Sequence, residues 1–401
     1  MNSSNLRWRA LPGGIWVLGF GSLFMDMSSE LIHSLLPIFM VTTLGASMLT
    51  VGIIEGIAEA TAAIVKVFSG ALSDYLGKRK LLLVLGYALA ALTKPVFPLA
   101  ETIGWVFAAR FIDRVGKGIR GAPRDALVAE MTTARVRGAA YGLRQALDSV
   151  GALLGPLLAV VLMLWLANDI RSVMWLGVIP AFVAVFLLWL YVREPLTPEK
   201  KVGSKVKVPL RLTDARRLPL RYWMVVLLGA VFTLARFSEA FLVLRAQDIG
   251  MALSYIPIVM IVMNVFYAGV AYPAGVASDR VSQRALLILG LVLLIGADLV
   301  LAYATSAIQV FAGAALWGLH MAFTQGLLSK LVADRAPAEL LGTAFGIFNL
   351  VSGLALLLAS GFAGLLWTEY GAATTFLSGA GFALLASVGL LMSARGRKPK
   401  R

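Results

Sequence analysis

Long apolar runs recur along the whole chain, and they constrain its fold more than any other feature of the sequence. Each run has about 20 residues or more, which is enough for a helix to cross a hydrocarbon layer roughly 30 Å thick. Only 14% of the residues are charged, whereas a soluble domain carries about 25%. The runs are continuous rather than alternating, and inside lipid only helices or closed barrels satisfy their own backbone polar groups. The sequence therefore predicts an all-α membrane protein that crosses the bilayer many times.

Twelve membrane spans are expected, in two groups of six. They cover residues 14–43, 48–72, 80–100, 103–123, 137–165, 172–192, 221–246, 252–277, 284–304, 307–330, 341–367 and 371–394. The grouping predicts an N-terminal six-helix bundle over 1–192, a linker over 193–220, a C-terminal six-helix bundle over 221–394 and a basic tail over 395–401. The first residues do not read as a cleaved signal, because they lead directly into a long first span.

The net charge of +15 is distributed unevenly between the two sides of the expected membrane. On the side opposite the N-terminus, the only basic residues are Arg171, in a loop, and Arg245, at the very end of the seventh span. An excess of Lys and Arg on one side sets the orientation of a membrane protein. We therefore expect both termini and the linker in the cytoplasm, in a plasma membrane such as the bacterial inner membrane. The same distribution argues against nucleic acid as a partner.

Several functional classes find no support in the residues. Cysteine is absent and only two histidines are present, so no thiol chemistry is available and no metal site or cofactor is expected. No phosphate-binding loop has the Walker spacing, and no set of nucleophile and base indicates an enzyme. Uphill transport would therefore use an ion gradient or a partner that supplies energy.

The two halves of the chain repeat each other. The segment GALSDYLGKRK at 70–80 recurs as GVASDRVSQRA at 275–285, an offset of 205 residues. The segment LVAEMTTARVRGAAYGL at 127–143 recurs as LVADRAPAELLGTAFGI at 331–347, an offset of 204. A parallel repeat of this kind relates the halves by an axis along the membrane normal and predicts a substrate site between them near the midplane.

Over essentially its whole length the chain resembles the major facilitator superfamily. Its signature between helices 2 and 3 is a Gly-x-x-x-Asp-x-x-Gly pattern followed by two basic residues, read here from Gly70 to Arg79. In the family this cluster latches one conformer, and the resemblance also implies a small-molecule substrate and a functional monomer. The tight turn needs Gly77, and Asp74 is expected just beyond a helix end, where it can pair with Arg79. The latch residues implied are Gly70, Asp74, Gly77, Arg79, Asp279 and Arg280.

Helix 5 carries a second pattern that resembles the antiporter motif of the exporting branches, including drug/proton antiporters. It comprises Gly142, Gly151, Gly155 and Pro156, but Ala159 and Val160 stand where the motif ends in glycines. Small residues let helices approach closely and proline bends a helix, so ordinary packing is the alternative explanation. The resemblance implies export in exchange for protons.

Charged residues inside the expected spans form a second group of candidates. A charge at the bilayer centre costs about 2.5–3.5 kcal/mol on insertion scales, so these residues should line a wet cavity or pair with each other. The basic ones are Lys66, Lys94, Arg110, Arg114, Lys117, Arg120, Arg144 and Arg236. The acidic ones are Asp26, Glu30, Glu55, Glu59, Asp113, Asp148, Glu239 and Asp298.

Helical spacing predicts how these charges are used. On helix 1 one polar stripe is expected, formed by Ser22, Asp26, Ser29, Glu30, His33 and Pro37. A carboxylate binds a proton more tightly in a low-dielectric cavity and less tightly beside a guanidinium, and alternating access can exchange these surroundings. The expected proton-coupling residues are Asp26, Glu30, Glu55, Glu59 and Asp113. A permanent salt bridge is the alternative for each acid, and Asp298 is expected to pair or to lie at the end of its span.

The arginine stripe of helix 4 resembles the family's helix 4 signature, whose arginine serves proton coupling. Either Arg110 or Arg114 matches it, and we favour Arg114 because it lies nearer mid-membrane and follows Asp113. The expected substrate-binding residues are His33, Arg114, Lys117, Arg144, Asp148, Arg236, Glu239, Asn264 and Tyr267.

The sequence as a whole predicts a proton-coupled antiporter that exports a small polar or amphiphilic organic compound. Two alternatives stay open. One is a symporter that imports an organic anion on the same cationic residues. The other is a divalent-metal transporter that uses His33 and the nearby acids.

Overall fold

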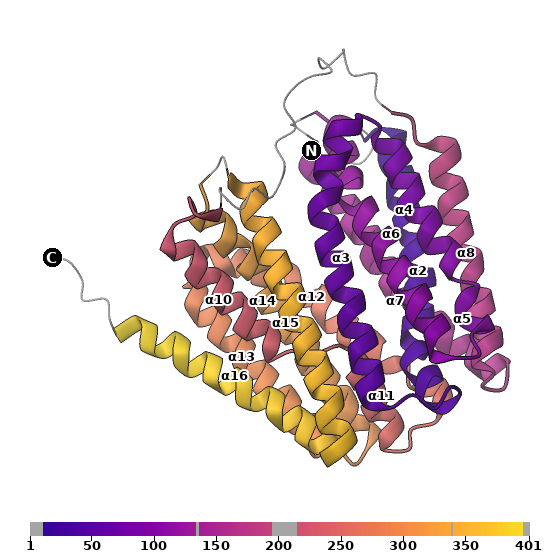
Figure 1. Ribbon diagram of the computed structural model, residues 1–401, viewed down its shortest axis with the longest axis vertical. Helices are drawn as coiled ribbons and strands as arrows, with labels where there is room; N and C mark the ends of the chain where they lie inside the picture. Colours follow the sequence, from indigo (N-terminus) through magenta and orange to yellow (C-terminus); the bar gives the residue numbers. More distant parts are fainter. Residues whose placement is uncertain (1–10, 134–135, 195–214, 338–339, 396–401) are drawn as a thin grey trace, which may run out of the picture. The chain divides into compact units, whose positions relative to one another are not determined.

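A computed structural model describes residues 11–133, 136–194, 215–337 and 340–395. Within these ranges the side chains of residues 71, 74, 279, 280 and 392–395 are outside the description. All the regular secondary structure in the described chain is helical (Figure 1). Each of the twelve expected spans corresponds to one helix or to a pair of helical segments, so the predicted fold class is confirmed.

Seven helices make up the first six spans, because only the third span is interrupted. The helices are α2 (Gly13–Thr42), α3 (Met48–Leu76), α4 (Arg79–Thr93), α5 (Val96–Leu99), α6 (Ile103–Glu130), α7 (Arg137–Trp165) and α8 (Ile170–Tyr191). The break between α4 and α5 falls at Lys94 and Pro95. Proline has no backbone N–H and clashes with the preceding turn, which explains the interruption.

The last six spans follow the same pattern, with the break in the seventh. They are α10 (Leu220–Leu234), α11 (Ala240–Asp248), the short 3-10 helix η1 (Leu253–Tyr255), α12 (Ile258–Arg280), α13 (Gln283–Ala302), α14 (Ala307–Arg335), α15 (Leu341–Tyr370) and α16 (Ala372–Arg395). Residues 235–239 separate α10 from α11 without a proline or glycine.

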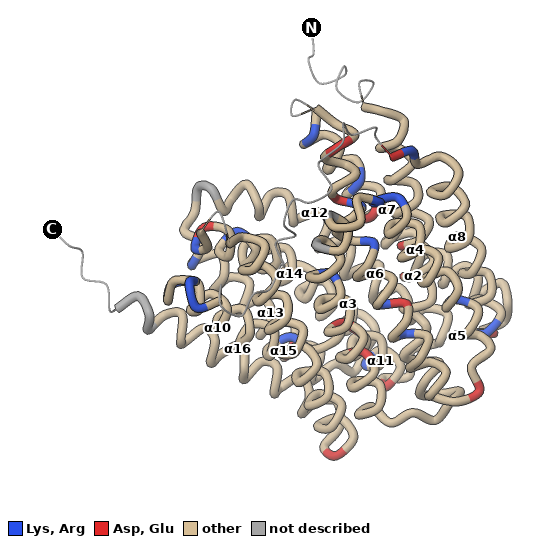
Figure 2. The backbone as a smooth tube through the Cα atoms, turned by 45° about the horizontal axis from the view of Figure 1, so that its top comes forward, with Lys and Arg blue, Asp and Glu red and all other residues tan. Residues whose placement is uncertain are grey.

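Within the described residues, ten helices are long and apolar enough to cross a membrane. Two expected spans fall outside this set for physical reasons. Helix α6 carries charges on successive turns, as the blue and red stretches along it in Figure 2 show, and α10 has only 15 residues. Helix α6 can therefore cross a membrane only if its charges are buried. Helix α10 can do so only if the seventh span continues through α11.

The chain divides into two compact units. Unit 1 contains Met1–Leu35 and Thr61–Pro209, and unit 2 contains Leu36–Ala60 and Leu210–Arg401. In unit 1, α4 packs against α6 and α8. In unit 2, α13 packs against α14 and α16, and α12 packs against α14.

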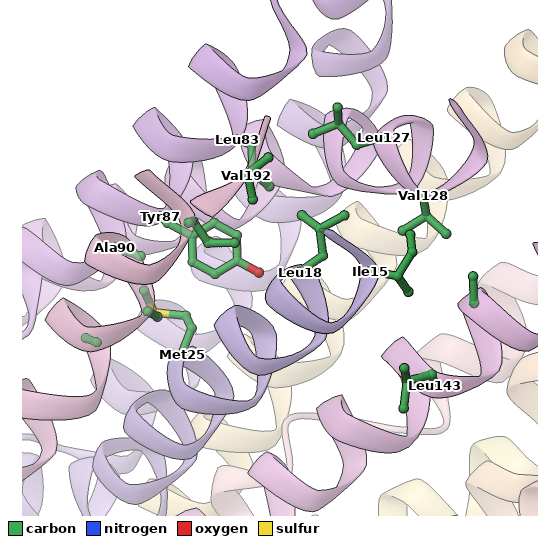
Figure 3. Close-up of a cluster of buried hydrophobic side chains, with 14 of the residues drawn as sticks. Ile15, Leu18, Met25, Leu83, Tyr87, Ala90, Leu127, Val128, Leu143 and Val192 are labelled. Atoms are coloured by element: carbon green, nitrogen blue, oxygen red, sulfur yellow. The ribbon is translucent and has the colours of Figure 1, made fainter. Parts of the chain in front are cut away.

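A hydrophobic core in unit 1 joins α2, α4, α6, α7 and α8 (Figure 3). Ile15, Leu18 and Met25 of α2 are fully buried in it, together with Tyr87 of α4. The hydroxyl of Tyr87 reaches out of this core to the hydroxyl of Ser22, 2.9 Å away. The core therefore fixes one end of the polar stripe on α2.

Candidate substrate and proton site

A group of buried charged side chains lies in unit 1 between α2, α6 and the break after α4. We call it the cationic centre, and it consists of Ser29, His33, Lys94, Arg110, Asp113 and Arg114. Five of these six side chains belong to residues less than 10% exposed, and His33 has a side chain 11% exposed. Three cations and one anion meet there, so the centre carries an excess of positive charge.

Lys94 anchors the centre. It is fully buried, and its Nζ donates to Asp113 Oδ1 at 2.9 Å and to Ser29 Oγ at 3.0 Å. Asp113 Oδ2 also lies 3.8 Å from Arg114 Nε. A buried charge is tolerated when it is paired and hydrogen-bonded, and Lys94 and Asp113 meet that condition together. Asp113 therefore forms a salt bridge, which was the alternative expected for each acid.

His33 faces arginines rather than only the acids of its own helix. Arg110 hydrogen-bonds to its Nε2, and the Arg114 guanidinium nitrogen lies 3.1 Å from Nε2 and 3.2 Å from Nδ1. Glu30 Oε1 is 3.7 Å from Nδ1 on the other side. Arg110 and Arg114 therefore contact the same imidazole. The sequence allowed either of them to match the family's helix 4 signature. Lys117 is exposed on the next turn of α6.

A second polar group, which we call the arginine–aspartate network, begins one turn closer to the start of α2. Its members are Ser22, Asp26, Tyr87, Arg120, Arg124, Asp125, Arg144 and Asp148. Arg120 stacks over the Tyr87 ring at 4.3 Å and approaches Asp26 Oδ1 at 3.8 Å. Arg144 donates to Asp148 Oδ2 at 2.9 Å. The two substrate-binding candidates on α7 thus pair with each other.

Two glycines of α7 pack directly on the backbone of α2. A Cβ added at Gly151 would lie 2.5 Å from the Leu23 carbonyl oxygen, and one at Gly155 would lie 2.7 Å from that of Met27. The same added atoms would meet Cβ of Asp26 at 3.2 Å and of Glu30 at 2.8 Å. Pro156 follows and is buried in α7, whereas a Cβ at Gly142 would meet nothing within 4 Å.

The remaining candidates lie in unit 2. Glu55 is buried and Glu59 half-buried on the first part of α3, which belongs to that unit. Arg236 and Glu239 are half-buried in the break between α10 and α11. Asn264 is half-buried on α12, and Tyr267 donates from its hydroxyl to Gln325 at 3.2 Å. The expected roles were proton coupling for the two acids of α3 and substrate binding for the others, and all of them are described within unit 2.

The latch residues are described in part. Gly77 has a φ of +61°, which confirms that the turn after α3 needs glycine. The placement of Asp74 beyond a helix end is wrong, because α3 continues to Leu76. Its side chain and those of Asp279 and Arg280 lie outside the description, while Gly70 is half-buried. Arg79 pairs with Glu130 at 3.1 Å, a partner that the sequence did not suggest.

Sequence reasoning missed two features of these groups. Tyr87 gave no signal, because it is one aromatic residue in an apolar span. The pairing of Lys94 with Asp113 was also missed, although both were recognised as charges inside spans. Ser22 and Ser29 were expected on the polar stripe of α2, but no contact was assigned to either.

Comparisons with known proteins agree on one family. The sequence matches the Major Facilitator Superfamily over residues 18–256 and 237–401. It is 32% identical to the "Uncharacterized MFS-type transporter MJ1317" of Methanocaldococcus jannaschii, covering 98% of this chain and 97% of that protein. It is 26% identical to "Multidrug resistance protein MdtH" of Edwardsiella ictaluri, covering 96% and 94%. Among solved structures, a mutant of the nucleoside transporter NupG superposes with a TM-score of 0.79 at 13% identity, covering 95% of this chain and 99% of that one.

Proposed function

Because the chain belongs to the major facilitator superfamily, we propose that it is a proton-coupled antiporter that exports a small polar or amphiphilic organic compound by alternating access. The relative from Edwardsiella ictaluri supports the direction of transport, since its name describes multidrug resistance. The proposal includes a functional monomer in the plasma membrane, with both termini in the cytoplasm.

The contact between α7 and α2 is the observation that carries this proposal. Gly151 and Gly155, from the pattern that resembles the antiporter motif, touch the turns of α2 that bear Asp26 and Glu30. The two acid side chains are 27% and 26% exposed, so neither is sealed in the protein interior. Each also lies within 4 Å of a basic side chain, Arg120 or His33. A shift of α7 along α2 would change the surroundings of both carboxylates, and with them the affinity of each carboxylate for a proton.

The cationic centre is the proposed binding site for an anionic group of the substrate. Arg110 and Arg114 lie close together on α6, and guanidinium groups bind carboxylate, sulfonate or phosphate through two parallel hydrogen bonds. Lys117, Arg144 and Asp148 would tune this site from the neighbouring turns. The proposed substrate contacts in unit 2 are Arg236, Glu239, Asn264 and Tyr267.

The same centre favours a second candidate function, a symporter that imports an organic anion. The cations that hold the anion would be the same, and only the direction relative to the proton would differ. A divalent metal is disfavoured as substrate, because the His33 imidazole contacts two guanidinium groups. Among the described residues, no group of three His, Cys, Asp or Glu side chains could hold a metal ion.

Inside-out membrane vesicles distinguish the two transport directions. The probe is naphthalene-1-sulfonate, an amphiphilic anion, and tetraphenylphosphonium is the cation of similar size. Antiport predicts anion uptake that is driven by an acid vesicle interior and is lost in Asp26→Asn. The control is Asp334→Asn, because this exposed α14 carboxylate contacts Gln283, far from α2 in the sequence. Uptake driven by an acid exterior, in the direction of the proton, would contradict antiport and support the symporter.

A further inference from the structure

Asp298 of α13 has an unusual environment within unit 2. Its side chain is fully buried, and neither carboxyl oxygen has a hydrogen-bond partner among the described residues. A Cβ added at Gly379 of α16 would lie 2.7 Å from Oδ2 and 3.2 Å from Cε1 of the Phe237 ring. The absent side chain of Gly379 is therefore what leaves room for the carboxyl group. Of the two expectations for Asp298, pairing is not found among the described residues, whereas its position four residues before the end of α13 agrees with the other.

Among the residues that the structure describes, no charge in the surrounding elements compensates this carboxyl group. Between Ala372 and Leu391, α16 contains no titratable residue. On α14, His320 uses its Nδ1 to hydrogen-bond the Gly290 carbonyl oxygen at 2.8 Å. Near the end of α13, Arg245 of α11 donates to the carbonyl oxygens of residues 301, 302 and 304 and pairs with Asp248. Arg236, in the same break as Phe237, donates no hydrogen bond to Asp298, and Glu239 of that break is itself an acid and cannot compensate a carboxylate.

The free-energy cost of burying a charge decides whether such a carboxyl group is ionised or protonated. An ionised carboxylate without a partner in an apolar interior is so unfavourable that the group takes up a proton instead. Asp113 in unit 1 is equally buried but ionic, because Lys94 lies 2.9 Å away. Asp298 has no such partner within the described part of the chain.

The internal repeat makes this contrast sharper. Helices α4 and α13 begin at Arg79 and Gln283, and α6 and α14 begin at Ile103 and Ala307, so each pair is offset by 204 residues. That offset relates Lys94 to Asp298 and Asp113 to Trp317.

The positions that hold an ion pair in the first half thus hold an acid and an indole in the second. The Trp317 Nε1–H is also buried and has no acceptor among the described residues. Its ring packs against Phe237 with 5.4 Å between centroids. The second half keeps two polar groups at these positions without the compensating charges of the first.

We propose that Asp298 is a proton-binding site of the second half, protonated in the conformation described and deprotonated when the packing of Gly379 and Phe237 around it opens. On opening, the carboxyl O–H bond breaks and the proton passes to water. The route is short, since Asp298 precedes the last residue of α13 by four positions, about 6 Å along the axis. The role in coupling rests on the proposed function, whereas the bound proton does not.

Infrared spectroscopy of the purified full-length protein tests the bound proton directly, with H₂O exchanged for D₂O. At about pH 7 exposed carboxyls are ionised, so a carbonyl band of a protonated acid identifies a buried neutral carboxyl. We expect this band in the wild type, its loss in Asp298→Asn and its shifted return in Asp298→Glu. Asp334→Asn is the matched control and should keep the band. Identical wild-type and Asp298→Asn spectra from folded proteins would overturn the proposal.

The role in coupling is measured in the vesicles described above. We expect Asp298→Asn to lose proton-driven uptake of naphthalene-1-sulfonate while exchange of labelled for unlabelled anion continues. If the variant keeps proton-driven uptake, Asp298 takes no part in coupling. If the wild type itself shows no proton-driven uptake, the proposed antiport fails together with the coupling role. The infrared result then decides the proton site alone.

Discussion

Replacing Gly155 with alanine would put a methyl group into the contact between α7 and α2. The new Cβ would lie 2.7 Å from the Met27 carbonyl oxygen and 2.8 Å from the Leu31 nitrogen, whereas ordinary contacts begin at 3.4 Å. The helices must therefore separate by about 0.7 Å, because both neighbouring atoms belong to the backbone and no rotamer change can move them. Overpacking of this kind costs about 1–3 kcal/mol, and the higher helix propensity of alanine returns about 1 kcal/mol.

Gly142→Ala supplies the matched control on the same helix. It has the same gain in propensity, but its Cβ meets nothing within 4 Å. The difference in unfolding free energy between the two variants therefore measures the packing cost alone, and we expect Gly155→Ala to be the less stable by about 1–3 kcal/mol. The measurement is reversible denaturant unfolding in detergent, alongside vesicle transport. Equal stability of the two variants would refute the close contact between α7 and α2.

Three further predictions follow from other contacts. In Lys94→Met and Asp113→Asn, breaking the buried pair should cost about 3–5 kcal/mol in either single variant, and a double-mutant cycle should show strong coupling; additive effects would mean that the two groups do not interact. Lys94→Met should be the milder change, because Arg114 stays near Asp113, and the same unfolding curves give this ranking. Outside the membrane, the Ser172 hydroxyl and then the backbone N–H groups at the start of α8 lower the pKa of Asp169, so its stabilisation is present above about pH 4 and is lost as the pH falls through the lowered value. Thermal unfolding of Asp169→Asn should depend less on pH in this acidic range, and parallel curves for variant and wild type would contradict the assignment.

Local periodicity made much of the fold predictable. Each apolar run predicts a helix by itself, and the repeated segments at 70–80 and 275–285 indicate that the two halves share one sequence pattern. The break after Lys94 had a signal in Pro95, although the sequence was read as one continuous span. The break at 235–239 had none, because it contains neither glycine nor proline and depends on tertiary packing.

The candidate site was predictable only within single helices. Spacing placed His33 with Asp26 and Glu30 on one stripe of α2, but its contact with Arg110 and Arg114 depends on how α6 packs against α2. The isolation of Asp298 depends on residues about 60 and 80 positions away, Phe237 and Gly379. No pattern within a span carries that information.

The break in the seventh span also creates two helix ends inside that span. The last carbonyl groups of α10 give its end a partial negative charge, and the first N–H groups of α11 give its start a partial positive charge. Arg236 directly follows the C-cap of α10, and Glu239 is the N-cap of α11. Each side chain therefore carries a charge of opposite sign to that of the helix end beside it. Each of these attractions stabilises the break by about 0.3–1 kcal/mol. The order of these two charges along the chain, basic before acidic, is therefore what suits them to this break, and exchanging them would turn both stabilising interactions into repulsive ones.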